Sequence, residues 1–219
     1  MPTLHRTLAV AGLLLTLAVA SIVGLGQAQA DQPLGETQPP PCRAALLIID
    51  VQSAWLGPDA LTIDHILVQE KTAAIAETAR ANGIPVVFVK DIAYRYRFTD
   101  KQLEIAPPLA ILEGDHLVEK THPNGFLDTP LAALLQDMGI TTLLITGYAS
   151  HECVKATVAG ALQHGFEVII VADGHSGGNG DFWARRQNQV WTDSGLLVLL
   201  STQIDFAALC AEASTETGG

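Results

Sequence analysis

Short apolar runs alternate along this chain with longer segments of helical periodicity. A run of four to eight apolar residues without polar alternation is typical of a strand buried on both faces of a sheet. Five such runs, and a shorter segment ending in lysine, predict strands at residues 44–51, 85–90, 116–120, 141–146, 167–172 and 196–201. Strands that alternate with helices in this way predict one α/β domain: a doubly wound, Rossmann-like, six-stranded parallel sheet with helices on both faces.

Capping residues mark where the intervening helices begin and end. The capping signals and periodicity together predict helices at residues 64–83, 129–139, 150–165, 181–194 and 204–211. Asp64, Thr129 and Ser150 are the expected N-caps of the first three, and Gly165 is placed to end the third. Residues 91–114 show no clear period, and so long a connection is typical of a functional or lid-like loop.

The first 30 residues have the pattern of a signal peptide. His5 and Arg6 precede an uncharged apolar stretch at residues 8–25, and residues 28–30 have the small-x-small pattern of a cleavage site. We therefore predict an exported protein, periplasmic or secreted, with a signal peptide at residues 1–30. An uncleaved membrane anchor is the alternative, because the apolar stretch is long for a signal peptide. The rest divides into a flexible lead-in, the folded domain and a C-terminal tail at residues 31–43, 44–211 and 212–219.

Composition and charge exclude several classes of protein. The chain has 219 residues, 48% of them hydrophobic, which suits one domain with a full core. Its net charge of −11 argues against a surface that binds nucleic acid or, once the signal peptide is cleaved, an anionic membrane. The three cysteines lack zinc-ligand spacing. Cys42 and Cys210 flank the predicted core and could pair in an oxidising compartment, but we expect them to be unpaired.

Three polar residues with complementary chemistry lie at or just after the ends of predicted strands: Asp50, Lys120 and Cys153. The carboxyl ends of the strands form the ligand crevice of an open parallel sheet. Cys153 falls in the first turn of a predicted helix, where the helix dipole favours a thiolate, so we expect its pKa below the ordinary value of about 8.5. A carboxylate can accept the thiol proton, an ammonium favours the thiolate, and the thiolate can attack a carbonyl carbon. Each residue alone has an ordinary structural explanation, and only their conjunction predicts a site.

Three longer segments together resemble the isochorismatase-like cysteine hydrolases. LLIIDVQSAWL at residues 46–56 resembles the first motif of that superfamily, and KTHPNGFLDTPL at residues 120–131 resembles its lysine motif. Residues 139–176 resemble its nucleophile motif, and the similarity holds in order and register over residues 44–206. The superfamily includes nicotinamidases, N-carbamoylsarcosine amidase, ureidoacrylate amidohydrolase and streptothricin hydrolase. The resemblance implies a six-stranded parallel sheet with flanking helices.

The resemblance also implies roles for individual residues. Asp50 corresponds to the catalytic acid/base, Lys120 to the lysine of the triad and Cys153 to the nucleophile. It implies a cis peptide bond between Tyr148 and Ala149, and an oxyanion hole formed by the N–H groups of Ala149 and Cys153. The expected substrate-binding positions are Gln52, Trp55, Phe126 and Tyr148.

Departures from the superfamily pattern narrow the expected chemistry. Nicotinamidases carry a metal-binding Asp-x-His after the second strand, whereas Asp91 is followed here by Ile92 and Ala93. We therefore predict no metal and no other cofactor, and nicotinamide becomes a less expected substrate. An intact triad favours cleavage of a C–N bond in a small amide, ureide or cyclic imide. The alternatives are an isochorismate-type vinyl-ether hydrolase, which needs no cysteine nucleophile, and a non-catalytic or thiol-redox binding protein on the same fold. The resemblance also allows a homo-oligomer.

Three further features each have two interpretations. Residues 94–97, Tyr-Arg-Tyr-Arg, either meet an anionic substrate or form a solvated loop, and the second is favoured. His175 follows the fifth strand, where it either contacts the substrate or packs the loop. His151 and Glu152 flank the nucleophile, but adjacent helical positions face different directions, which argues against a metal-binding pair.

Overall fold

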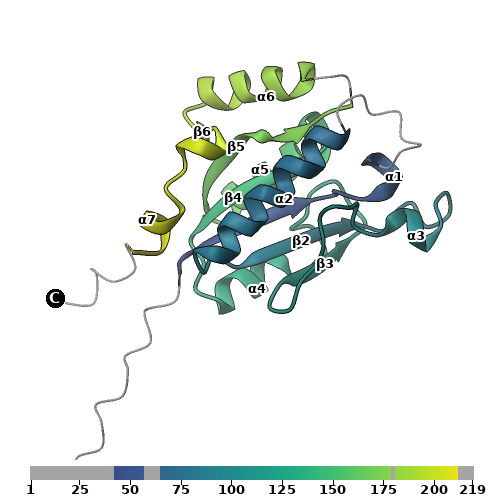
Figure 1. The fold of residues 1–219 in the computed structure, drawn as a ribbon, viewed down its shortest axis with the longest axis horizontal. Coiled ribbons are helices and arrows are strands. Elements are labelled where there is room, and N and C mark those ends of the chain that lie inside the picture. The colour runs from purple at the N-terminus through teal and green to yellow at the C-terminus, as the bar shows by residue number, and fades with distance from the viewer. Residues whose placement is uncertain (1–41, 57–64, 179–180, 212–219) are drawn as a thin grey trace, which may run out of the picture. The chain divides into compact units, whose positions relative to one another are not determined.

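The computed structural model describes residues 42–56, 65–178 and 181–211, and its centre is a six-stranded parallel sheet (Figure 1). The strands are β1 (Ala44–Ile49), β2 (Val86–Asp91), β3 (His116–Lys120), β4 (Thr142–Tyr148), β5 (Glu167–Ser176) and β6 (Leu197–Leu199). They lie in the order β3-β2-β1-β4-β5-β6, and every neighbouring pair is parallel. The predicted fold class is confirmed. β5 continues beyond its predicted end to Ser176, into the glycine-rich segment.

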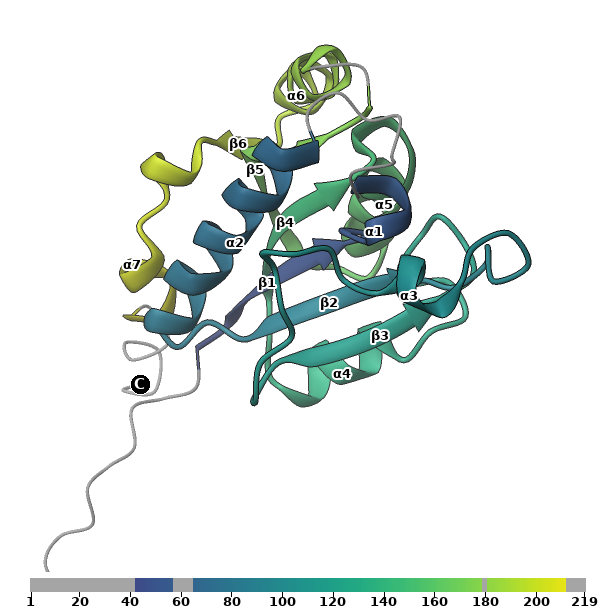
Figure 2. The same cartoon turned by 45° about the vertical axis from the view of Figure 1, so that its right-hand side comes forward.

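Helices cover both faces of the sheet (Figures 1 and 2). One face packs against α2 (His65–Ala81) and α7 (Phe206–Ala211). The other packs against α4 (Leu131–Asp137), α5 (Lys155–Gln163) and α6 (Phe182–Asp193). The shorter elements are α1 (Ser53–Leu56), α3 (Asp100–Leu103), η1 (Ser150–Val154) and η2 (Ser201–Gln203). The short helices α1 and α3 lie beyond the carboxyl ends of β1 and β2 (Figure 2).

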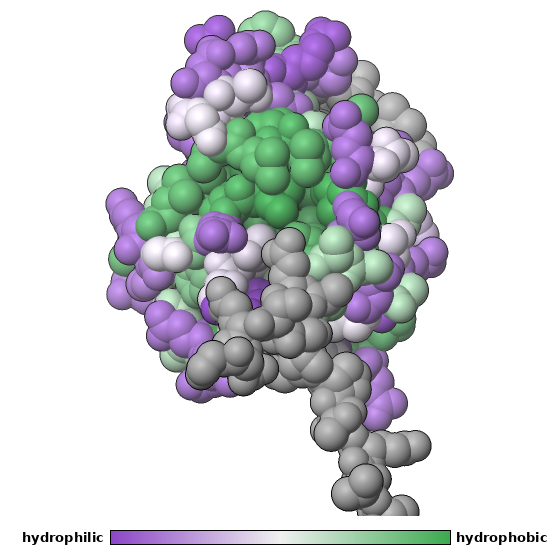
Figure 3. All heavy atoms as spheres, turned by 90° about the vertical axis from the view of Figure 1, so that its left-hand side faces the viewer, coloured by the Kyte–Doolittle hydropathy of each residue, from purple (hydrophilic) through white to green (hydrophobic). Residues whose placement is uncertain are grey.

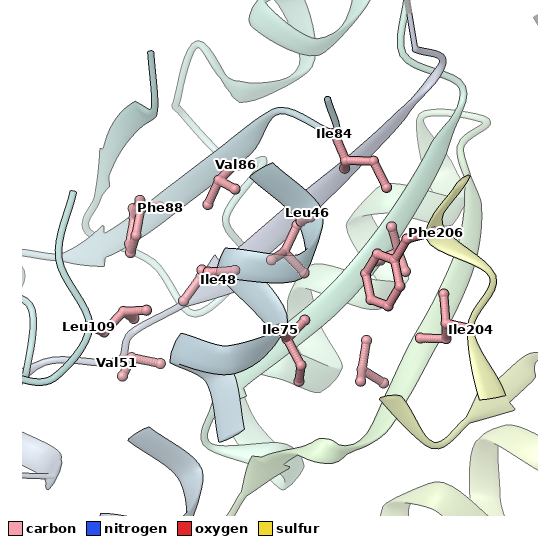
Figure 4. Close-up of a cluster of buried hydrophobic side chains, with 14 of the residues drawn as sticks. Leu46, Ile48, Val51, Ile75, Ile84, Val86, Phe88, Leu109, Ile204 and Phe206 are labelled. Atoms are coloured by element: carbon pink, nitrogen blue, oxygen red, sulfur yellow. The ribbon is translucent and has the colours of Figure 1, made fainter. Parts of the chain in front are cut away.

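The position of β1 in the middle of the sheet explains why its sequence is an unbroken apolar run. Successive side chains of a strand point to opposite faces of the sheet, and both faces of this sheet are covered. Leu46 and Ile48 join the core under α2 (Figure 4), whereas Leu47 and Ile49 join the core on the opposite face. All six residues of β1 are buried, so a polar residue is tolerated only where the strand ends, at Asp50.

The predicted helix caps match the structure only in part. Asp64 lies outside the described residues. The N-cap of α4 is Pro130, although the Thr129 hydroxyl accepts a hydrogen bond from the Leu131 N–H at 3.3 Å. Ser150 does not cap a helix, because the residue before it is the N-cap of η1 and its own hydroxyl bonds elsewhere. Gly165 has a φ of 82°, as expected for a glycine that ends a helix.

The long connection after β2 contains a short helix that its composition did not reveal. Thr99 caps α3 through a capping box with Gln102, in which each side chain bonds to the other residue's backbone N–H. The single turn of α3 is too short to show a hydrophobic period. Part of residues 91–114, which the sequence predicts to be irregular, is therefore a capped helical turn.

The structure corrects the expectation that Cys42 and Cys210 are unpaired. They form a disulfide that joins the residue before Arg43 at the start of the domain to α7, 168 positions later in the chain. Both pack against the core under α2. The sequence alone could not place α7 beside β1, so the pairing was not predictable. Cys153 is the free cysteine of the three.

Two surface features bear on how the domain meets its surroundings. Among the residues that the structure describes, no helix is long and apolar enough to cross a membrane. The predicted signal peptide lies outside those residues. Figure 3 shows an apolar patch on the face that carries the edge strand β6, of which Leu197 is half exposed.

Candidate active site

The carboxyl ends of β1 to β4 bring four reactive side chains together. Lys120 Nζ lies 2.8 Å from Asp50 Oδ2, 3.3 Å from Asp91 Oδ2 and 3.4 Å from Cys153 Sγ. Asp91 and Lys120 face each other in register at the ends of β2 and β3. The structure brings the predicted residues Asp50, Lys120 and Cys153 together at this edge of the sheet. Asp91 is an addition that the sequence did not assign to this cluster.

Asp50 is held by an unusual backbone conformation directly after β1. Its φ is 52°, in the left-handed region that non-glycine residues adopt at a cost of about 1–3 kcal/mol. Oδ2 pairs with Lys120, whereas the buried Oδ1 has no hydrogen-bond partner among the described residues. Because one carboxylate oxygen of Asp50 and the sulfur of Cys153 lie within 4.8 Å of each other, the Asp50 carboxylate is placed to accept a proton from the Cys153 thiol.

Burial sets the protonation state of the cluster. It raises the pKa of Asp50 to about 6 in spite of the charge on Lys120. Burial, and next the negative charge of Asp50, raises the pKa of Cys153 to about 12. For Lys120 burial acts to lower the pKa, but the charges of Asp50 and Cys153 outweigh it and the pKa is raised. The resting site at neutral pH therefore holds a carboxylate, an ammonium and a thiol, which corrects the expectation of a lowered pKa at Cys153.

A glycine near the end of β4 allows this strand to approach β1 closely just before the turn that carries Cys153. Gly147 has a φ of 127°, and a Cβ there would collide with the carbonyl of Ile49 on the neighbouring strand. Only glycine fits such a close approach at this conformation. The following Tyr148–Ala149 peptide bond is cis, as the resemblance implied. Cys153 then lies in η1, the turn that joins β4 to α5.

A chain of hydrogen bonds connects this turn to β5 and α6. Asn188 donates its Nδ2 hydrogen to the carbonyl of Ala172 at 3.0 Å, which turns its Oδ1 toward His175 Nε2 at 2.9 Å. His175 Nε2 must therefore carry the proton, and its bare Nδ1 accepts a hydrogen bond from the Ser150 hydroxyl at 2.8 Å. Of the two interpretations of His175, the structure supports packing, because the residue is buried and lies outside the cavity wall.

Replacing His175 by Asn should reveal this role through the pH dependence of stability. Burial lowers the pKa of His175 to about 4, so as the pH falls below about 6.5 the unfolded chain binds a proton that the folded chain does not. The stability that neutral His175 contributes is present above about pH 6.5 and is lost toward pH 4. We expect the variant to be less stable at neutral pH, and the difference to shrink by about 2 kcal/mol between pH 7 and pH 5. Urea unfolding at both pH values measures it.

The exposed His164 provides the control for this measurement. His164→Asn makes the same substitution at an exposed position and shows how far the substitution by itself changes the free energy of unfolding. A His175→Asn variant whose stability difference is the same at both pH values would contradict the buried neutral imidazole.

A cavity of about 330 Å³ opens above the cluster. Its wall includes five of the predicted site residues: Asp50, Trp55, Tyr148, Ala149 and Cys153. Lys120 lies beneath the wall with its side chain fully buried. The cavity is large enough for a small organic molecule, and Asp50 and Cys153 both belong to its wall.

Two predicted substrate-binding residues lie outside the cavity wall. Gln52 is fully buried and links strand ends, since it donates to the carbonyls of Asp91 and Leu103 and accepts from the Asp91 N–H at 2.8 Å. It therefore holds Asp91 in place. Phe126 is buried in the core of the opposite face, with its ring centroid 5.7 Å from that of Phe166. Neither residue belongs to the cavity wall, so the geometry does not support the predicted contact of these two residues with a substrate.

The cluster also contains the side chains of a possible metal site. Asp50, Asp91 and Cys153 could each offer one ligand atom. The Lys120 ammonium, however, lies within 3.4 Å of an atom of each of them and already supplies the positive charge. A metal ion among these atoms would meet that ammonium at close range, so this donor set suits a lysine-centred triad better than a metal.

Comparison with known protein families matches residues 44–192 to the Isochorismatase domain. The chain is 33% identical over 136 residues to the isochorismatase family protein YddQ of Bacillus subtilis (strain 168), a match that covers 59% of this chain and 75% of the relative. It is 32% identical over 135 residues to streptothricin hydrolase of Streptomyces noursei, covering 60% of this chain and 49% of that one. It is 33% identical over 135 residues to the secreted isochorismatase effector Isc1 of Verticillium dahliae, covering 59% and 70%.

Solved structures share the same fold. A cysteine hydrolase from Pseudomonas syringae pv. phaseolicola 1448A superposes with a TM-score of 0.69 at 18% identity, covering 79% of this chain and 94% of that one. N-carbamoylsarcosine amidase from Thermoplasma acidophilum superposes with a TM-score of 0.65 at 25% identity, covering 74% and 99%.

Proposed function

The chain belongs to the isochorismatase family of hydrolases, and from this premise we propose that it is a cysteine-dependent amidohydrolase. It cleaves a C–N bond in a small amide, ureide or cyclic imide. The observation that carries the proposal is that the Cys153 thiol and the Asp50 carboxylate line one cavity, with the Lys120 ammonium directly beneath them within 3.4 Å of both. The similarity to a named amidase of the same fold supports it.

In the first half of the proposed reaction, the Asp50 carboxylate accepts the Cys153 proton while Sγ attacks the amide carbon. Because the pKa of the thiol is raised to about 12 and that of Asp50 only to about 6, a free thiolate is costly in the resting site. Proton transfer is therefore coupled to formation of the S–C bond, which passes the negative charge on to the carbonyl oxygen. The N–H groups of Ala149 and Cys153 are the proposed donors to that oxyanion, and one such donor typically contributes roughly 2.7–4 kcal/mol.

In the second half, the proton on Asp50 moves to the leaving nitrogen as the C–N bond breaks. The acyl group remains on Cys153 as a thioester. Asp50, again a carboxylate, takes a proton from water, and the hydroxide attacks the thioester carbon. The acid product leaves and Cys153 recovers its proton from Asp50. Throughout the cycle Lys120 holds Asp50 in place at 2.8 Å and balances its charge.

Two accompanying proposals concern cofactors and location. The reaction is independent of metal ions, because the Lys120 ammonium supplies the positive charge inside the only cluster of possible metal ligands found among the described residues. The protein acts outside the cytoplasm, as its N-terminal sequence predicts. The similarity to a secreted isochorismatase protein and the disulfide between Cys42 and Cys210 support an oxidising compartment.

A substrate panel tests the proposed function. The purified protein is incubated with small primary amides, ureides, cyclic imides and, as a counter-substrate, isochorismate, and C–N cleavage is followed by release of ammonia or ring-opened product. We expect turnover of at least one amide-type compound, unchanged by a chelator and absent in Cys153→Ala. Cleavage of the vinyl ether that survives in Cys153→Ala, without amide turnover, would contradict the proposal.

A further inference from the structure

The charges around the cavity are unbalanced. Three carboxylate side chains belong to its wall, those of Asp50, Asp91 and Glu152, whereas the described lining residues include no lysine or arginine. Lys120 lies below the wall and is already shared between Asp50 and Asp91. Lys120 therefore neutralises part of the charge of two of these carboxylates, and Glu152 remains as the third. Because carboxylates outnumber lysine and arginine side chains here, the cavity presents a negative potential to an entering molecule.

The basic segment at residues 94–97 does not change this balance. Tyr94 forms part of the wall, but Arg95 pairs with Glu119 at 3.3 Å and Arg97 lies over the ring of Phe98 at 5.4 Å. Neither arginine belongs to the lining of the cavity. Of the two interpretations of this segment, the role of meeting an anionic substrate therefore finds no support in the geometry.

Three aromatic side chains also line the cavity. Trp55 contacts Tyr94 edge-on, with ring centroids 5.2 Å apart, and both line the cavity together with Tyr148. The face of an aromatic ring carries partial negative charge and attracts cations, most strongly for tryptophan. Carboxylates and aromatic faces are the groups that bind ammonium and guanidinium ions in proteins, so the two features favour the same ligand charge.

Glu152 is the wall residue best placed to select by charge. It precedes the nucleophile, its side chain is exposed, and it forms no ion pair with any residue in ranges 42–56, 65–178 and 181–211. A non-helical backbone at Glu152, with φ −120° and ψ −105°, separates it from the regular helix that follows. Asp50 and Asp91 are engaged by Lys120, which leaves Glu152 as the carboxylate of the wall that has no ion-pair partner among the described residues.

We propose that the cavity selects positively charged amides, those carrying an ammonium, amidinium or guanidinium group, over anionic ones, and that Glu152 is the residue that sets this preference. The inference rests on the proposed function only in taking Cys153 as the point that the substrate must reach. An anionic substrate would bring its charge next to carboxylates that nothing on the wall offsets.

Two thiol reagents of similar size and opposite charge test the preference without requiring catalysis. The cationic trimethylammonioethyl and the anionic sulfonatoethyl methanethiosulfonates both transfer their thioalkyl group to the Cys153 sulfur, forming a mixed disulfide and releasing methanesulfinate. Cys42 and Cys210 are already bonded to each other and do not compete. Each rate is divided by the rate of the same reagent with 2-mercaptoethanol, which removes the difference in intrinsic reactivity.

At low ionic strength we expect the normalised cation-to-anion rate ratio to be about tenfold, and to fall toward one at about 0.5 M salt. Glu152→Lys should reduce the ratio about tenfold or more, whereas Glu77→Lys, the same charge change on the exposed side of α2, should leave it as it was. A ratio at or below one in the unmodified protein, or equal ratios in the two variants, would overturn the charge preference. Neither result would contradict the proposed amidohydrolase function, which the substrate panel tests separately.

Discussion

Replacing Cys153 by Ala should lower kcat/KM for an amide substrate by about 10⁴-fold or more, to the level of the uncatalysed background. Among the described residues of the cavity wall, the thiol is the strongest nucleophile, and it can form a covalent bond to the amide carbon and then release the acyl group to water. Asp50 and Lys120 remain in the variant, but they have no nucleophile to activate. Initial rates on a substrate from the amide panel measure the effect.

The comparison variant for this experiment is Cys153→Ser, which keeps a small hydrogen-bonding side chain at the same position. Both variants should unfold at nearly the same urea concentration as the unmodified protein, because Cys153 is only partly buried. A hydroxyl is a far poorer nucleophile than a thiol in this setting, so Cys153→Ser should also lose most activity. If either variant kept a substantial part of the activity while folded, the covalent mechanism would be wrong.

Replacing Asp50 by Asn should lower kcat by about 10²–10⁴-fold and abolish the acid limb of the pH profile. The mechanism needs the Asp50 carboxylate as a base, and burial raises its pKa to about 6. Activity of the unmodified protein should therefore fall as the pH drops through about 6, where the carboxylate takes up a proton. The Asn side chain cannot titrate, so the residual activity of the variant should not show this limb.

Asp128 supplies a matched control. Among the described residues it is the other aspartate with a positive φ, 55°, and its side chain is exposed. Asp128→Asn makes the same chemical change in the same backbone conformation outside the cavity wall, and it should preserve both the rate and the acid limb. A persistent limb near pH 6 in Asp50→Asn would assign that titration to another group and remove Asp50 from the role of base.

The elements that the sequence predicted well are those governed by strong local patterns. The run from Ala44 to Ile49 is apolar at every position because both faces of β1 are covered, so the strand and the polar residue that ends it are both recognisable. β4, which is buried along most of its length, is recognisable in the same way, and Cys153 follows it. The edge strand β3 is partly exposed, and it was recognised as a short segment that ends in Lys120. Parallel strands place their carboxyl ends along one edge, and this geometry made the convergence of the triad predictable.

The features that the sequence missed depend on contacts between distant segments. Gln52 and Phe126 occupy motif positions, but only the folded chain shows that one ties β1 to β2 and that the other fills the core. The sequence analysis considered Asp91 only as half of an Asp-x-His metal motif that lacks its histidine. Its position opposite Lys120 follows from the register of β2 and β3. The raised pKa of Cys153 likewise follows from its burial beside Asp50, which the helix-dipole argument did not include.

The central claim is that Cys153 carries the acyl group during turnover, and rapid-quench intact-protein mass spectrometry tests it most directly. The protein is mixed with excess of the best amide substrate, quenched in acid within one turnover, and its mass compared with that of the unreacted protein. The account predicts one added acyl group, mapped to the peptide that contains Cys153, which appears before the product and is absent in Cys153→Ala. Hydrolysis that proceeds at full rate with no acyl adduct at any quench time would contradict it.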